Sequence, residues 1–206
     1  MERSISNLED EHLYEKVLKT IDIVKANQAG LLVLVPAVLL YGLPFYFIWK
    51  NDLNFRELVD AFTWAATFKW VAIFFLGIIA HELVHGITWA LFAKKGFRSI
   101  RYGVMWKLLT PYCHCKEPLM IRHYIIGAIT PFIFVGLLPA IYAIATGSVG
   151  WLVFGIFYTV GAIGDFMIID LLRKEKMTDY ALDHPSEAGC WVFKKREAGS
   201  QAYEEA

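Results

Sequence analysis

Charge, cysteine and targeting signals are all scarce in this sequence. Basic and acidic residues number 20 each and together make up 19% of the 206 residues, so no excess of positive charge favours nucleic-acid binding. The three cysteines, Cys113, Cys115 and Cys190, are not a disulfide framework. The first apolar run follows an acidic stretch and not a short basic one, which argues against a secretory signal peptide. We therefore expect neither a nucleic-acid-binding nor a disulfide-stabilised protein.

Long apolar runs are what the sequence does contain. Hydrophobic residues make up 57% of the chain and the mean hydropathy is +0.44, whereas soluble domains usually contain about 45–50% apolar residues. A membrane-spanning helix needs about 20 mostly apolar residues. The segments that meet this requirement are about 29–49, 70–92, 124–145 and 151–172. We therefore expect an all-α integral membrane protein with a four-helix core over residues 29–172.

The distribution of lysine and arginine predicts the orientation of these spans. Seventeen of the 20 basic residues lie in the N-terminal segment, in the second loop or after residue 172, and three lie in the first loop. Positively charged loops remain on the cytoplasmic side of a membrane. We therefore expect a multi-pass protein of the cell membrane with its N- and C-termini in the cytoplasm.

Two segments outside the spans have a regular pattern. In residues 1–28, apolar side chains from Ile5 to Val24 recur at roughly helical spacing, which predicts an amphipathic helix on the inner membrane surface or packed on the second loop. Residues 99–108 alternate apolar and polar side chains, which predicts a small cytoplasmic strand or hairpin between the second and third spans. Residues 173–206 are expected to be a cytoplasmic tail.

The second span contains the sequence His81-Glu82-Leu83-Val84-His85. Positions i and i+4 of a helix lie on one face, so both imidazoles can reach one zinc ion. Glu82 is not needed as a ligand and is placed to take a proton from a zinc-bound water. Ionisable groups inside a membrane helix are tolerated when they face the bundle interior and have partners. The alternative is a polar cluster whose members satisfy one another without a metal.

Catalytic zinc usually has three protein ligands, so one ligand is missing from this motif. The candidates are Asp165, Asp170, His114, His123 and His184. A helical rise of about 1.5 Å per residue puts Asp165 at the depth of the histidine pair and Asp170 near the inner surface. Gly77 and Gly161 each precede one of the proposed ligands by four residues, and small residues let membrane helices approach closely. We favour Asp165, the alternative being a carboxylate that binds water or supports helix packing.

The histidine motif and Gly164-Asp165 together resemble the site-2 protease class of intramembrane zinc metallopeptidases. More closely, the chain is similar to a bacterial family described as zincin peptidases, from the second span to Cys190. This similarity includes Thr110–Pro118 and Asp183–Gly189. The resemblance implies peptide-bond hydrolysis within or at the edge of the membrane, with His81, His85 and Asp165 as Zn²⁺ ligands and Glu82 as general base. The segment 162–166 replaces the longer Asn- and Pro-containing stretch that site-2 proteases usually carry there.

Four further residues are candidates for a supporting or substrate-binding role: His114, Cys115, Gly164 and His184. Neighbouring side chains of an extended segment point to opposite faces, so His114 and Cys115 are better suited to support the ligands than to bind the metal, unless they lie in a buried turn. His184 belongs to a turn that covers the mouth of the site or is a plain surface turn. Residues 99–108 are expected to bind substrate by strand addition.

Three functions are compatible with these residues. The first is a zinc-dependent intramembrane or juxtamembrane endopeptidase that acts on a membrane protein or peptide in the lipid bilayer. The second is a non-catalytic zinc-binding membrane protein with a structural or partner-recruiting role. The third is a transporter or haem-binding module, although four spans without an obvious inverted repeat do not favour a transporter. Nothing in the sequence indicates a particular oligomeric state.

Overall fold

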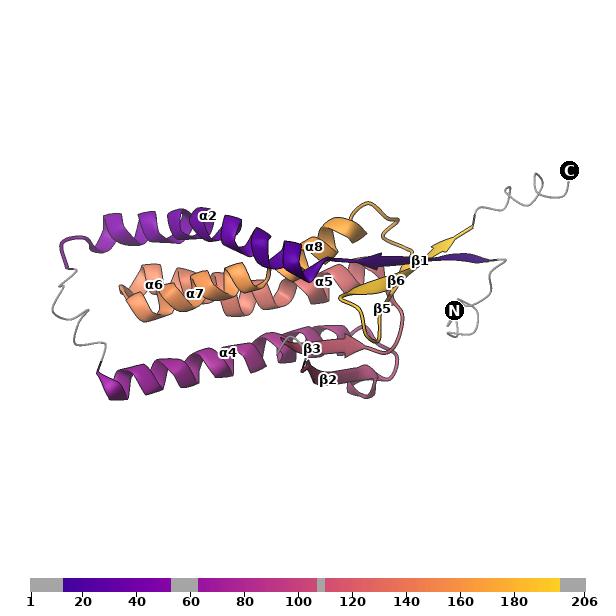
Figure 1. Ribbon diagram of the computed structural model, residues 1–206, viewed down its shortest axis with the longest axis horizontal. Coiled ribbons are helices and arrows are strands. Elements are labelled where there is room, and N and C mark those ends of the chain that lie inside the picture. Colours follow the sequence, from indigo (N-terminus) through magenta and orange to yellow (C-terminus); the bar gives the residue numbers. More distant parts are fainter. Residues whose placement is uncertain (1–12, 53–62, 107–109, 197–206) are drawn as a thin grey trace, which may run out of the picture.

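The computed structural model describes residues 13–52, 63–106 and 110–196 and forms an elongated helical bundle with strands at one end (Figure 1). The helices are α2 (Ile23–Trp49), α4 (Trp64–Ala90), α5 (Ile121–Pro131), α6 (Leu138–Thr146), α7 (Val149–Gly161) and α8 (Ile163–Leu172), with the 3-10 helix η1 (Gly96–Ser99) and the π-helix η2 (Phe132–Leu137). The strands are β1 (Tyr14–Thr20), β2 (Ile100–Met105), β3 (Thr110–Cys115), β4 (Leu119–Met120), β5 (Tyr180–Asp183) and β6 (Gly189–Lys195).

Four helical stretches are long and apolar enough to cross a membrane. They are Ile23–Trp49, Trp64–Ala90, Ile121–Thr146 and Val149–Leu172, in agreement with a multi-pass membrane protein. The first begins earlier than expected because the Asp22 carboxylate caps it and accepts a hydrogen bond from the Val24 backbone N–H at 2.8 Å. Such a cap satisfies a helix-terminal donor that otherwise has no intrahelical partner.

The third and fourth spans are each interrupted in the middle. Pro131 ends α5, η2 follows as a π-helix, and α6 resumes with Pro139 in its first turn. Wide π turns accommodate helix irregularities and often accompany functional sites. The fourth span breaks at Ala162, between α7 and α8, which leaves Asp165 in the first turn of α8.

The hairpin expected in the second loop is present. Strands β2 and β3 pair antiparallel, with Ile100 opposite Cys115 and Met105 opposite Thr110, and the hairpin lies beside the C-terminal part of α4 (Figure 1). The Tyr102 hydroxyl lies so close to Gly86 of α4 that a Cβ atom there would clash with it. The absence of a side chain at Gly86 therefore lets the hairpin pack directly against the helix that carries the histidine motif.

The expected all-α class and the amphipathic N-terminal helix need correction. Residues 14–20 form strand β1, and with segments from the second loop and the C-terminal tail they build a four-stranded antiparallel sheet in the order β1-β6-β5-β4. Residues 1–12 lie outside the described part. The apolar residues of this segment fit a helical period, but seven consecutive residues of β1 gain backbone partners in β6, from Tyr14 opposite Lys195 to Thr20 opposite Gly189. The spacing of apolar residues within residues 14–20 cannot reveal a partner strand so far away in the sequence.

A partly buried ion-pair cluster connects this sheet to the end of the helical bundle. Glu175, just after α8, pairs with Lys19 of β1 at 2.9 Å and with Lys194 of β6 at 2.8 Å. Burial alone would raise the pKa of Glu175, but the two ammonium groups hold this pKa below its usual range. Since the sheet contains strands from both ends of the chain and from the second loop, all three segments lie at the same end of the bundle.

Candidate metal centre

Helix α4 carries both imidazoles of the proposed centre on one face. The rings of His81 and His85 are 5.0 Å apart between centroids, one helical turn from each other. His85 is 5% exposed, so its imidazole faces the interior of the bundle and not the lipid. This orientation agrees with the rule that ionisable groups in membrane helices point inward.

Asp165 of α8 reaches between these two rings. Its Oδ2 lies 3.2 Å from His81 Nε2 and its Oδ1 lies 3.3 Å from His85 Nε2. One ligand atom from each of the three residues lies within 4.8 Å of the others. The structure thus brings Asp165 to two histidines that precede it by 84 and 80 positions in the sequence.

The ring of His85 is held in one orientation from two sides. Its Nδ1 is 2.9 Å from the Gly127 carbonyl oxygen of α5, and since a carbonyl only accepts hydrogen bonds, Nδ1 carries the hydrogen. The ring also stacks on Trp89 at 5.0 Å and 16°. In the neutral imidazole, the lone pair is therefore on Nε2 and points at Asp165.

This arrangement leaves two hydrogen-bond acceptors facing each other, His85 Nε2 and Asp165 Oδ1. Acceptors held at such a distance repel unless a proton or a metal ion lies with them. Two imidazole nitrogens and one carboxylate oxygen form a donor set that zinc prefers, and three protein ligands with an open fourth position are typical of catalytic zinc. The residues present therefore fit a zinc ion.

Glu82 is next to this group but is not one of the three converging ligands. Its carboxylate accepts a hydrogen bond from the backbone N–H of Cys113 in β3. The hydrogen-bond pattern between β2 and β3 explains why this N–H is available. Lys116 N donates to Ser99 O at 2.7 Å, so in the alternating antiparallel pattern Cys113 and Cys115 direct their N–H groups away from β2. The hairpin thus presents a backbone donor to the side chain expected to act as a base.

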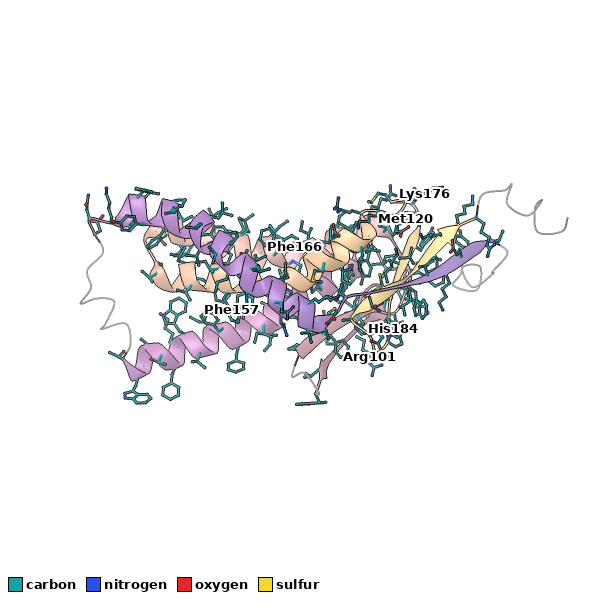
Figure 2. The ribbon with its side chains drawn as sticks, turned by 45° about the horizontal axis from the view of Figure 1, so that its top comes forward. Arg101, Met120, Phe157, Phe166, Lys176 and His184 are labelled. Carbon is teal, nitrogen blue, oxygen red and sulfur yellow. The ribbon has the colours of Figure 1, made fainter. Side chains whose placement is uncertain are left out.

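The remaining predicted residues lie outside the three-ligand group. The rings of His114 and Tyr112 lie 4.3 Å apart between centroids and are tilted by 36°. Burial, together with Arg101 and His184, lowers the pKa of His114. Arg101 and His184 both lie at the strand-bearing end of the molecule (Figure 2). His184 Nδ1 accepts hydrogen bonds from Ser186 N and Glu187 N, which is the behaviour of a residue that organises a turn.

Cys115 and Gly164 are also not among the three converging ligands. Burial raises the pKa of the Cys115 thiol to about 12. All three cysteines are free and buried. Gly164 lies near Ile21, where a Cβ atom would be 3.9 Å from the side chain, so this position is on the side of α8 that faces the start of α2.

The proposed role of Gly77 and Gly161 in close helix approach is wrong in its details. A Cβ atom on Gly77 would stand 2.5 Å from the Tyr158 hydroxyl, whereas one on Gly161 would have no neighbour within 4 Å. Gly77 accommodates an aromatic ring and not a helix backbone. The carboxylate reaches the histidines because α8 restarts at the break beside Ala162 and α5 packs against both α4 and α8.

Four residues of the centre's surroundings had not been recognised in the sequence: Gly127, Trp89, Tyr124 and Asp183. Trp89 lies where a Cβ atom on Gly127 would be, and its indole N–H donates to the Tyr124 carbonyl at 3.0 Å. Trp89 follows His85 by four residues, so the helical period that joined the two histidines also pointed to this position.

Comparison with known proteins gives a family for this chain. Residues 74–180, just over half of the sequence, match the family described as "Putative zincin peptidase". The chain belongs to this family. The matched segment contains the histidine motif and Asp165, and the name zincin implies a zinc-dependent peptidase. No curated protein and no solved structure matches this chain.

Proposed function

We propose that this protein is a zinc-dependent endopeptidase that hydrolyses a peptide bond within the membrane or at its edge. The observation that carries the proposal is the convergence of His81, His85 and Asp165, whose ligand atoms lie within 4.8 Å of one another. The family description supports the same reaction class. The substrate is expected to be a membrane protein or a membrane-associated peptide.

The side chains of the centre have distinct tasks in this reaction. Bound zinc supplies Lewis acidity, which lowers the pKa of a water molecule and polarises a peptide carbonyl. Glu82 removes one proton from the attacking water and delivers it to the amide nitrogen as the carbon–nitrogen bond breaks. The second proton of the water passes from the new carboxyl group to the amine, so the products are a carboxylate and an ammonium group, and Glu82 returns to its ionised state. The Gly127 carbonyl and Trp89 keep His85 Nε2 directed at the metal position.

Water is proposed to reach this centre from the strand-bearing end of the bundle. The distribution of basic residues assigns that end to the cytoplasm, and the sheet and hairpin are both located there. We propose that the protein lies in the cell membrane with both termini in the cytoplasm. Reporter fusions at residue 206 and in the first loop would test this topology, and a cytoplasmic first loop would contradict it.

A free strand edge offers a way to bind the substrate backbone. In the antiparallel pattern, Tyr102 and Val104 of β2 direct their backbone groups away from β3, and β2 has no second partner among the described strands. We propose that the substrate adds to this edge. A Val104→Pro variant, which lacks the outward N–H, should impair cleavage and keep zinc, whereas Val104→Ala should cleave normally. Unimpaired cleavage by Val104→Pro would contradict strand addition.

Zinc content and substrate accumulation test the proposed function directly. Purified wild type and Glu82→Gln should each contain one zinc per chain, and Asp165→Ala should contain much less. Cells with Glu82→Gln should accumulate uncleaved membrane proteins that the wild type removes. Wild-type protein without zinc would overturn the proposal. A Glu82→Gln variant that keeps full biological function would favour the alternative, a non-catalytic zinc-binding module.

A further inference from the structure

Strand β5 ends in a carboxylate that holds together two elements around the metal centre. Asp183 Oδ1 accepts a hydrogen bond from the Tyr124 hydroxyl of α5, and its Oδ2 accepts one from the Cys115 backbone N–H of β3 at 2.6 Å. Both oxygens are thus used by partners from different parts of the fold. Asp183 lies after the last membrane span, and the mechanism derived from the centre does not use it.

One branch of these contacts leads from Tyr124 to a proposed metal ligand. The Tyr124 ring lies against Trp89 at 5.1 Å, and its carbonyl accepts the indole N–H of Trp89. Trp89 in turn stacks on His85 at 5.0 Å. Tyr124, Trp89 and His85 are only 4%, 4% and 5% exposed, so the path is closely packed. A displacement of Tyr124 would therefore be transmitted to the imidazole.

The other branch leads through the hairpin to Glu82. Asp183 fixes the N–H of Cys115, and two residues earlier on the same strand edge the N–H of Cys113 donates to the Glu82 carboxylate. Backbone groups two residues apart on one strand keep a fixed spacing. The position of β3 relative to β5 therefore determines where the Cys113 donor meets Glu82.

We propose that Asp183 is a positioning residue of the metal centre, acting on His85 through Tyr124 and Trp89 and on Glu82 through β3. This inference rests on the proposed function, since it takes His85 as a zinc ligand. Residues that orient metal ligands from outside the coordination shell typically contribute about 10–100-fold to metal affinity. The C-terminal strands are thus part of the metal site and not a passive tail.

The test uses the full-length protein in detergent micelles, with zinc affinity measured by chelator competition. Asp183→Ala should weaken zinc binding about 10–100-fold. Tyr124→Phe keeps the ring against Trp89 and removes only the hydroxyl, so it should weaken binding less and remain folded. Combining the two substitutions should cost no more than Asp183→Ala alone, because Asp183→Ala already breaks the hydrogen bond that Tyr124→Phe removes. Asp170→Asn, an acidic residue paired on the surface with Arg173, is the matched control and should bind zinc normally.

Cobalt spectroscopy separates positioning from general destabilisation. The visible absorption of Co²⁺ in the site reports ligand geometry, so it should shift in Asp183→Ala and in Tyr124→Phe but not in Asp170→Asn. Unchanged zinc affinity and unchanged spectra in both variants, beside a wild type that binds one zinc, would overturn the positioning role alone. A wild type that binds no zinc would overturn the proposed function, and the positioning role with it.

Discussion

The membrane core and the sheet outside it both contain partly buried acidic side chains, but these have different partners. In the sheet region, Glu175 faces two ammonium groups and Asp183 faces a hydroxyl and a backbone N–H. In the core, Asp165 faces the Nε2 atoms of two imidazoles, one of which has its hydrogen on the opposite nitrogen. The first two carboxylates are complete as they stand. The third faces an imidazole lone pair and needs a proton or a metal ion there, which supports the proposed metal centre in the core.

Removing a proposed zinc ligand should have the largest effect of the changes considered. His85→Ala leaves two of three protein ligands, and we expect zinc affinity to fall by more than the roughly 100-fold typical of supporting residues. His184→Ala changes the same residue type in a turn outside the core and should keep its zinc. Metal content after dialysis measures both. Zinc retained by His85→Ala would show that the core carboxylate and imidazoles are merely a polar cluster.

Crowding the core should have the next largest effect. In Gly127→Ala, the new Cβ atom would collide with the Trp89 indole. Overpacking of this kind lowers the free energy of unfolding by about 1–3 kcal/mol. Gly161→Ala is the matched control, since no atom lies within 4 Å of the new Cβ position. Thermal unfolding in detergent compares the two variants. Equal midpoints for both would contradict the tight packing around His85.

The sheet region should be recognisable by its dependence on pH. Burial raises the pKa of Asp183 to about 6 from an ordinary value of 3.8, although its hydrogen bonds to Tyr124 and to the Cys115 N–H oppose this. A folded-state pKa above the unfolded one stabilises the protein at low pH, and this contribution is lost as pH rises through about 6. The loss should be on the order of 2 kcal/mol. Asp183→Asn should remove it, so unfolding midpoints of both proteins between pH 4.5 and roughly 7.5 provide the measurement. Parallel curves would contradict the assignment.

Breaking the ion pairs that Glu175 makes with the sheet should have the smallest effect. Glu175→Gln removes the charge shared by Lys19 and Lys194, and we expect a loss of about 1 kcal/mol that shrinks at high salt. Asp170→Asn, whose partners Arg173 and Lys174 are exposed, should unfold like the wild type. A salt-independent loss in Glu175→Gln would mean that packing and not charge makes this connection.

Local periodicity explains which parts of the fold were predictable. The four apolar stretches and the hairpin after α4 depend on neighbours in sequence, and the structure has them close to the expected positions. The spacing of His81 and His85 likewise follows from one helical turn. The depth argument placed Asp165 level with this pair, and the structure brings the three side chains together.

The four-stranded sheet could not be predicted in the same way. Strand β1 pairs with β6, and β4 has only two residues, too few for any period to show. The sequence predicts a turn at His184, and His184 does organise one. The carboxylate of the neighbouring Asp183, however, reaches α5 and β3. Contacts between segments this far apart leave no trace in local spacing.

The pairing of β1 with β6 also has a consequence for biosynthesis. A ribosome delivers the histidine motif long before Asp165, and β6 emerges later still, so a nascent chain has imidazoles inserted in the bilayer without their carboxylate or their supporting strands. Strand β1 must wait for its partner until β6 has been synthesised. The three proposed ligands and the strands that support them would therefore come together only after β6 has been synthesised.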